Sequence, residues 1–250
     1  MTTAGKQIGE FLSKKRDRLA TLLLETKITP NMLTLAGSAV NLFAAIFLAT
    51  GLHRTAGFIM ILANSFDVLD GALAKVSNRL TRFGDFLDST IDRYSDLFIF
   101  SGLIVFYSIH HKTVYVILVC IAMTGAVATS YIRAKGQNVL PIKCDAGFME
   151  RPERIITLII GALFNHIHVS IWIIAFLAQL TVIHRILYVK KGLEKLPETE
   201  NSDGKPDIYE GKSPLASLLL RILFLDFERT TWQFDLTCAV IIFILIFPPF

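Results

Sequence analysis

The sequence predicts an all-α, polytopic membrane protein, and three observations lead to this fold class. Hydrophobic residues make up 53% of the 250 residues and charged residues only 18%, whereas soluble domains are usually about 25% charged. The apolar residues fall in blocks of about 17–25 residues, the length that a helix needs to cross a bilayer. Basic residues are frequent in every second connection and rare in the others, as expected of a chain that crosses a membrane repeatedly.

Residues 1–28 are predicted to form an amphipathic helix at the membrane interface. Within residues 7–26, the apolar side chains fall roughly on one helical face and the basic ones elsewhere, which is typical of interfacial helices. A solvated helix packed on the protein is the alternative. The first residues have no continuous apolar core, so no cleavable signal peptide is expected.

Six transmembrane helices are predicted in residues 29–190. They cover residues 31–51, 55–76, 84–109, 113–135, 153–166 with a few flanking residues, and 168–190. A polar linker is expected at 191–213, followed by an amphipathic and apolar extension at 214–250. Whether residues 232–250 form a seventh span stays open, because they are barely long enough and contain Asp235.

The distribution of basic residues predicts the orientation. One side receives the basic residues of the N-terminal segment, of the loop near residue 80 and of the stretch 133–154, while the other receives only Arg54 and Lys112. By the positive-inside rule, the first side is cytoplasmic. We therefore expect a multi-pass protein of the cytoplasmic membrane. The net charge of +4 suits anionic lipid head groups or phosphorylated substrates, and nucleic acid is not expected as a partner of so apolar a chain. The three cysteines have no paired spacing, which indicates neither a disulfide framework nor a zinc site.

Four aspartates mark the candidate site. Asp67 and Asp70 share a face at the end of the second predicted span, and Asp88 and Asp92 share a face near the start of the third. A carboxylate at the centre of a spanning helix costs about 2.5–3.5 kcal/mol, and clustering adds repulsion. A divalent cation offsets both effects, since oxygen ligands suit Mg²⁺, Mn²⁺ or Ca²⁺.

Two glycines fit this hypothesis. Gly71 directly follows Asp70, and Gly84 begins the third span, so a ligand can approach the backbone at both points. The alternative is that the aspartates form ordinary interfacial ion pairs with nearby basic residues, namely Lys75, Arg79, Arg82 and Arg93. Asp85 and Asp96 are expected to be structural acids and not metal ligands.

The spacing Asp67-x-x-Asp70-Gly71-x-x-Ala74, then Gly84-x-x-x-Asp88-x-x-x-Asp92, resembles the signature of the CDP-alcohol phosphotransferase family. The resemblance covers about residues 29–190. It implies an enzyme in which an alcohol displaces CMP from a CDP-linked lipid, CDP-diacylglycerol or CDP-archaeol. The family has an arginine after the alanine, where this chain has Lys75; lysine keeps the charge but loses the forked contact with phosphate.

The resemblance also implies roles for these residues. Asp67, Asp70, Asp88 and Asp92 would hold Mg²⁺ or Mn²⁺, as a two-metal site, and the catalytic pair would be Asp88 and Asp92, with Asp92 as general base. The nucleotide pocket would be lined by Thr29, Pro30, Asn31, Thr34, Asp67, Asp70, Gly71, Ala74, Lys75 and Gly84. Thr29-Pro30 is equally consistent with a plain helix start.

A second, basic group of residues points to the acceptor. Ser130 and Arg133 end the fourth span, Arg151 and Arg154 begin the fifth, and Arg185 lies one turn from the end of the sixth. Arginine suits forked contacts with phosphate, so Arg133, Arg154 and Arg185 together predict a site for a phosphorylated alcohol. Positive-inside topology alone also predicts basic residues here. The regions resemble the phosphatidylinositol-phosphate and archaetidylinositol-phosphate synthases of the family, which implies inositol phosphate as acceptor and a homodimer. The resemblance also implies that Ser130, Arg133, Arg154 and Arg185 contact the acceptor phosphate, with Arg151 as a neighbour. Glycerol 3-phosphate is the rival acceptor.

Two other function classes are compatible with the acids. A divalent-cation transporter would use them as a permeation site, although they cluster at one membrane face and have no acidic counterpart at the other. A non-catalytic scaffold would not need the complete set of four aspartates.

Overall fold

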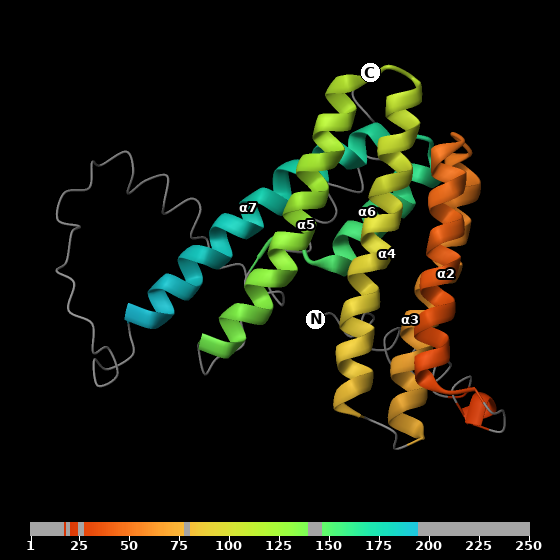
Figure 1. The fold of residues 1–250 in the computed structure, drawn as a ribbon, viewed down its shortest axis with the longest axis vertical. Helices are drawn as coiled ribbons and strands as arrows, with labels where there is room; N and C mark the ends of the chain where they lie inside the picture. The colour runs from red at the N-terminus through yellow and green to blue at the C-terminus, as the bar shows by residue number, and fades with distance from the viewer. Residues whose placement is uncertain (1–17, 19–20, 25–27, 78–80, 140–146, 195–250) are drawn as a thin grey trace, which may run out of the picture.

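The structure is a computed structural model that describes residues 18, 21–24, 28–77, 81–139 and 147–194. The described residues contain helices and no strand (Figure 1). The long helices are α2 (Pro30–Ala49), α3 (His53–Val76), α4 (Arg82–Ile109), α5 (Thr113–Val139), α6 (Arg151–Leu163) and α7 (Ile167–Glu194). The all-α prediction is confirmed for these ranges. Most of the expected interfacial helix, and the whole of residues 214–250, lie outside the described residues.

Four of these helices are long and apolar enough to cross a membrane, namely α2, α3, α5 and α7. The helices at the other two predicted spans, α4 and α6, do not have this combination of length and apolar character, for separate reasons. Helix α6 has 13 residues and is therefore about 20 Å long, shorter than a hydrocarbon core of about 30 Å. Helix α4 has 28 residues, but its first half carries the aspartates, which lowers its hydropathy.

The helices form two groups that share α4 as a neighbour. Helix α2 packs on α3 and α4, α5 packs on α7 and α4, and the short α6 contacts α3 and α7. In Figure 1, α5 and α7 diverge from the group of α2, α3 and α4 toward the bottom of the view. The polar residues described below lie in and beside this divergent region.

Small residues bring the helices close together. A Cβ on Gly102 of α4 would collide with the backbone of Ala45 in α2, and one on Gly125 of α5 would lie 2.8 Å from Cβ of Ala178 in α7. Such contacts are typical of membrane helix pairs, in which tight packing substitutes for the hydrophobic effect.

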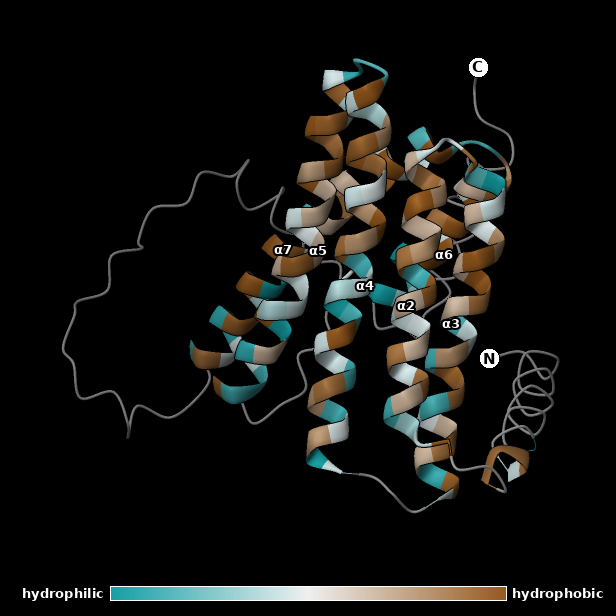
Figure 2. Cartoon of the chain, turned by 45° about the vertical axis from the view of Figure 1, so that its right-hand side comes forward, coloured by the Kyte–Doolittle hydropathy of each residue, from teal (hydrophilic) through white to brown (hydrophobic). Residues whose placement is uncertain are grey.

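The hydropathy of the helices changes along their length. Figure 2 shows hydrophobic residues dominating the upper parts of the helices and hydrophilic ones frequent in the lower part of α4. The apolar core includes Leu48, Met60, Phe100 and Ile171. Several charged side chains are nevertheless buried: Asp70, Glu150, Arg154 and Arg185.

Threonines begin two of the helices. Thr29 accepts a hydrogen bond from Met32 N at 3.4 Å at the start of α2. Thr81 accepts one from Gly84 N at 3.0 Å at the start of α4. Both satisfy a backbone donor that the first turn of a helix leaves unpaired.

Candidate active site

A pocket of about 150 Å³ brings together most of the predicted nucleotide residues. Its walls come from the first turn of α2, the last part of α3 and the start of α4. The predicted residues that line it are Pro30, Asn31, Thr34, Asp70, Gly71, Ala74 and Gly84, joined by Thr81, Asp85 and Asp88. Of the predicted set, Thr29, Asp67 and Lys75 are not among these lining residues, and Lys75 is exposed.

One hydrogen bond fixes the buried carboxylate of this pocket. Thr34 Oγ1 donates to Asp70 Oδ2 at 2.5 Å, and Asp70 is only 5% exposed. The bond joins α2 to α3 and holds one carboxylate oxygen in place. Hydrogen bonds to an ionised group are shorter and stronger than those between neutral groups.

The two predicted glycines have different surroundings. Apart from its two neighbouring residues and the nearby backbone of α3, no atom lies within 4 Å of a Cβ placed on Gly71, so the pocket is open there. A Cβ on Gly84 would lie 3.0 Å from Thr81 Oγ1 and 3.4 Å from Asn31 Oδ1. Gly71 therefore leaves space for a ligand, whereas Gly84 permits the close approach of the starts of α2 and α4.

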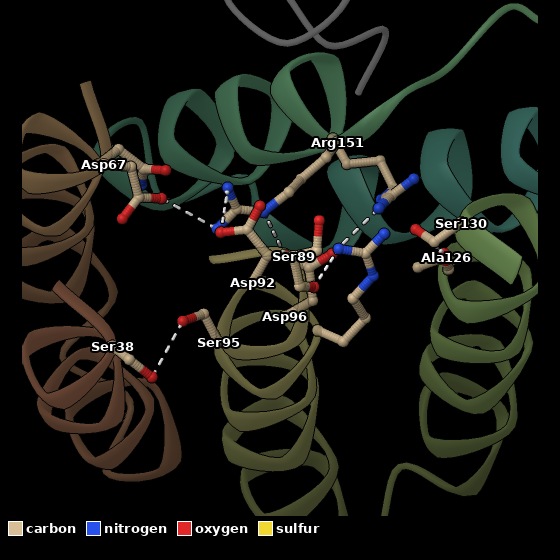
Figure 3. Close-up of polar contacts among 12 residues, drawn as sticks. Ser38, Asp67, Ser89, Asp92, Ser95, Asp96, Ala126, Ser130 and Arg151 are labelled. Atoms are coloured by element: carbon tan, nitrogen blue, oxygen red, sulfur yellow. Dashed lines mark hydrogen bonds and ion pairs between the residues drawn. The ribbon is translucent and has the colours of Figure 1, made fainter. Parts of the chain in front are cut away.

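Asp67, Asp92 and Asp96 gather around Arg151, the first residue of α6. Its Nη1 lies 2.8 Å from Asp92 Oδ1, its Nη2 lies 3.0 Å from Asp67 Oδ2, and its Nε lies 3.4 Å from Asp96 Oδ1. Figure 3 shows these carboxylates reaching Arg151 from two helices. One guanidinium thus occupies the position between Asp67 and Asp92.

The four predicted metal ligands accordingly fall into two pairs. Asp70 and Asp88 line the smaller pocket, while Asp67 and Asp92 share the Arg151 guanidinium. Within the described ranges, no three Asp, Glu, His or Cys side chains are placed closely enough to hold an ion between them. The chemistry of the donors still fits a divalent cation, because Asp67 and Asp92 already share one positive group and hard cations prefer carboxylate oxygens.

A second, larger cavity has a volume of about 590 Å³. All five predicted acceptor residues line it: Ser130, Arg133, Arg151, Arg154 and Arg185. Asp92 lines the same cavity. The structure therefore brings the predicted general base and the predicted phosphate-binding arginines to one space.

Buried contacts hold two of the arginines. Arg154 Nη2 lies 3.0 Å from Asp96 Oδ2 and its Nη1 donates to Thr129 Oγ1 at 3.2 Å. Arg185 Nη1 donates to the backbone oxygen of Thr129 at 2.6 Å. Arg154 and Arg185 are each 2% exposed, so their positions are set by the protein itself.

Glu150 is a site residue that sequence reasoning missed. Its Oε1 lies 2.8 Å from Arg185 Nη2, and its Oε2 lies 3.3 Å from Arg133 Nη1. The side chain is 6% exposed and lines the larger cavity. A signal was available in the sequence, because an arginine inside an apolar run needs a nearby acid.

Comparisons with known proteins agree with this geometry. The profile of the CDP-alcohol phosphatidyltransferase family matches residues 27–187. The chain is 33% identical over 214 residues to the phosphatidylinositol phosphate synthase of Mycobacteroides abscessus, which covers 82% of this chain and 97% of that protein. It is 34% identical over 178 residues to the archaetidylinositol phosphate synthase of Pyrococcus horikoshii, covering 71% of this chain and 92% of that protein.

Solved structures are also similar. The phosphatidylinositol phosphate synthase of Mycobacterium tuberculosis with CDP-DAG bound matches with a TM-score of 0.67 and 27% identity, over 77% of this chain and 98% of that one. The same enzyme in complex with manganese and citrate matches with a TM-score of 0.67 and 28% identity, over 81% and 98%.

Proposed function

The chain belongs to the CDP-alcohol phosphatidyltransferase family, and we propose that it transfers a phosphatidyl-type group from a CDP-linked lipid to inositol 1-phosphate. CMP is the second product. The observation that carries this proposal is the shared cavity: Asp92 and three arginines, Arg133, Arg154 and Arg185, line one space of about 590 Å³. A base for a hydroxyl and a binding site for a phosphate are the two things that a phosphorylated alcohol requires.

The lipid donor is CDP-diacylglycerol or CDP-archaeol. The relatives include synthases named for both lipid classes, and a similar solved structure contains CDP-DAG. The smaller pocket, with Asp70, Gly71 and Asp88, adjoins the aspartates and is the proposed nucleotide site. The open space at Gly71 supports this position, since it would let a diphosphate approach the helix closely.

Asp92 is the proposed general base. The acceptor hydroxyl oxygen attacks the lipid-bearing phosphorus, the bond from that phosphorus to the CMP oxygen breaks, and the hydroxyl proton passes to Asp92. Asp67, Asp70, Asp88 and Asp92 are the residues that would hold Mg²⁺ or Mn²⁺, which would stabilise the charge on the phosphate oxygens. Manganese is present in a similar structure, and the use of two ions is part of this proposal.

The arginines are the proposed specificity element. Arg154 and Arg185 are buried and held by Thr129, so they present charge in a fixed position. Arginine forks match phosphate oxygens in geometry as well as in charge. A phosphate can offer several acceptor oxygens to these arginines at once, whereas free inositol offers only hydroxyl groups, which favours inositol 1-phosphate over free inositol.

The membrane arrangement completes the proposal. We infer that α4 and α6, the latter with a few flanking residues, also cross the bilayer, giving six spans. The active site would then lie on the cytoplasmic face of the cytoplasmic membrane. Two chains would form a homodimer. Residues 29–190 form the catalytic domain. Four helices with the length and apolar character of spans support an integral membrane protein.

Release of CMP tests the acceptor. The purified protein in detergent receives CDP-diacylglycerol, Mg²⁺ or Mn²⁺, and one acceptor at a time: inositol 1-phosphate, glycerol 3-phosphate, inositol or serine. We expect CMP release with inositol 1-phosphate. An equal response to free inositol would remove the argument from the arginines, and a preference for glycerol 3-phosphate would replace the acceptor but keep the chemistry.

Two substitutions test the proposed catalytic residues. Asp88→Asn and Asp92→Asn keep the shape of each side chain but remove its charge, so both should abolish CMP release. Circular dichroism and size-exclusion chromatography check that the variants still fold. Turnover like that of the wild type in either variant would contradict the mechanism.

A further inference from the structure

Arg151 contacts the proposed metal-binding aspartates and also lines the larger cavity. Its guanidinium contacts Asp92 at 2.8 Å, Asp67 at 3.0 Å and Asp96 at 3.4 Å, so each nitrogen of the fork meets a different carboxylate. The same residue lines the cavity that contains the other arginines. It is therefore placed to interact either with the aspartates or with an anion in the cavity.

A cation bound to Asp67 and Asp92 would compete with Arg151 for these two carboxylates. The guanidinium and a metal ion are both positive, so they repel each other at such short distances, and each lowers the affinity of the carboxylates for the other. Asp96 would stay neutralised after a departure of Arg151, because Arg154 Nη2 lies 3.0 Å from its other oxygen. Asp67 and Asp92 have no such second arginine at salt-bridge distance in the part of the chain that the structure describes.

The location of Arg151 allows its side chain to move without the helix. It is the first residue of α6 and is followed by Pro152, so its long side chain extends from a helix end. The side chain is 22% exposed, in contrast to 2% for Arg154 and Arg185. Arg151 is thus the more accessible arginine of the three, while the other two are enclosed.

We propose that Arg151 is an exchangeable counter-ion that couples cation binding to acceptor binding. Without a divalent cation, the guanidinium neutralises Asp67 and Asp92. When the cation binds these carboxylates, Arg151 is released into the cavity and adds a further positive charge for the acceptor phosphate. The inference rests on the proposed function for the identity of the acceptor, but the exchange itself is a property of the protein, the cation and a phosphate.

This exchange predicts that cation and phosphate strengthen each other's binding. If the cation frees Arg151 for phosphate, phosphate must favour the cation by the same factor, because coupling between two sites is reciprocal. Attraction between a bound cation and a nearby phosphate also contributes to such coupling. Only the part that depends on Arg151 is lost when this side chain is neutralised.

Binding of Mn²⁺ measures the exchange without turnover. Free Mn²⁺ is followed by electron paramagnetic resonance in a titration of the full chain in detergent, with no CDP-lipid present. Arg151→Gln removes the competing charge, so its Kd for Mn²⁺ should be lower than that of the wild type by about fivefold or more. Arg133→Gln is the matched control, because it removes one arginine from the same cavity, where Arg133 pairs with Glu150.

A second titration, with inorganic phosphate at millimolar concentration and a protein-free correction, measures the coupling. Phosphate should lower the Kd for Mn²⁺ more in the wild type than in Arg151→Gln. Arg151→Lys keeps a charge but loses the fork, so its Kd should lie between those two. This variant replaces Arg151→Gln in the test if the latter does not fold.

The outcomes separate the exchange from the proposed function. A Kd in Arg151→Gln that is no lower than in Arg133→Gln overturns the exchange, as does an equal effect of phosphate in the wild type and in Arg151→Gln. The acceptor proposal stands or falls on CMP release, which these titrations do not use. Absence of Mn²⁺ binding in the wild type would contradict both the exchange and the proposed metal site, but not the choice of acceptor.

Discussion

Glu150 Oε1 accepts a hydrogen bond from Arg185 Nη2 at 2.8 Å, and both side chains are almost fully buried. The second carboxylate oxygen lies 3.3 Å from Arg133 Nη1. One glutamate thus neutralises two of the arginines to which we assign the acceptor phosphate. In the absence of a ligand, it supplies the negative charge that the phosphate would otherwise provide.

Glu150→Gln should therefore make stability depend on anions. The substitution leaves Arg185 buried without a full counter-charge, and breaking a buried pair costs about 3–5 kcal/mol. We expect a lower midpoint of thermal unfolding in detergent, partly restored by millimolar inorganic phosphate because the anion replaces the lost charge. The wild type should gain less from phosphate. An equal gain in both proteins would mean that Glu150 does not neutralise this cavity.

Thr34→Val should weaken binding of the CDP-lipid. The hydroxyl donates to the buried Asp70 carboxylate at 2.5 Å, and a hydrogen bond to a charged group contributes about 1.5–3 kcal/mol. Loss of the lower value corresponds to roughly a tenfold rise in KM for CDP-diacylglycerol. Thr34→Ser keeps the hydroxyl and is the control, with KM close to that of the wild type. If Ser and Val raise KM equally, the methyl group and not the hydrogen bond is what matters.

Gly71→Ala should separate ligand binding from stability. A methyl group at Gly71 meets no atom within 4 Å, and alanine is favoured over glycine within a helix by about 0.5–1 kcal/mol. The midpoint of unfolding should therefore stay equal or rise slightly. If the nucleotide diphosphate passes this point, the same methyl group should raise KM for the CDP-lipid. An unchanged KM would remove the diphosphate from this position.

Gly37→Ala should have the opposite effect on the fold. A Cβ on Gly37 of α2 would lie 2.9 Å from Asp67 Oδ1, 3.1 Å from Phe66 Cβ and 3.2 Å from the backbone oxygen of Ala63. Asp67 would have to turn or α2 would have to move away from α3, and such overpacking costs about 1–3 kcal/mol. We expect both a lower unfolding midpoint and slower CMP release, because Asp67 is one of the residues that would hold the cation. Rates and midpoints like those of Gly71→Ala would contradict this contact.

The helices and the spacing of the aspartates are local patterns, so the sequence predicts both, but the structure groups Asp70 with Asp88 and Asp67 with Asp92. Spacings of three and four residues place Asp67 with Asp70 and Asp88 with Asp92 on any α-helix, and apolar blocks mark the helices whatever their packing. Lys75 shows the limit of such reasoning. It follows Ala74 by one residue, which is about 100° around the helix, and so it is exposed while Ala74 lines the pocket.

The contacts of Arg151 could not be predicted, because they depend on tertiary packing. Spacing alone gave no reason to prefer Arg151 over Arg154 as a partner of the aspartates, since both begin the same helix. The packing of α6 against α3 places Arg151 against Asp67, while Arg154 contacts Asp96 of α4 and Thr129 of α5. Helix α6 also ends at Leu163, before the predicted end at residue 166, because Asn165 has a positive φ in the turn that joins it to α7.

The close approach of α2 and α4 gives a test of the fold itself. A Cβ on Gly102 would collide with the backbone of Ala45, including its carbonyl oxygen, and backbone cannot move aside as a flexible side chain can. Gly102→Ala should therefore force the two helices apart and lower the free energy of unfolding by about 1–3 kcal/mol, despite the higher helix propensity of alanine. Thermal unfolding in detergent, followed by the loss of the folded peak in size-exclusion chromatography, measures the change. Ser101→Ala is the control, because Ser101 is the preceding residue of α4 and is exposed; it should unfold like the wild type. If Gly102→Ala also unfolds like the wild type, α2 and α4 do not pack through this glycine.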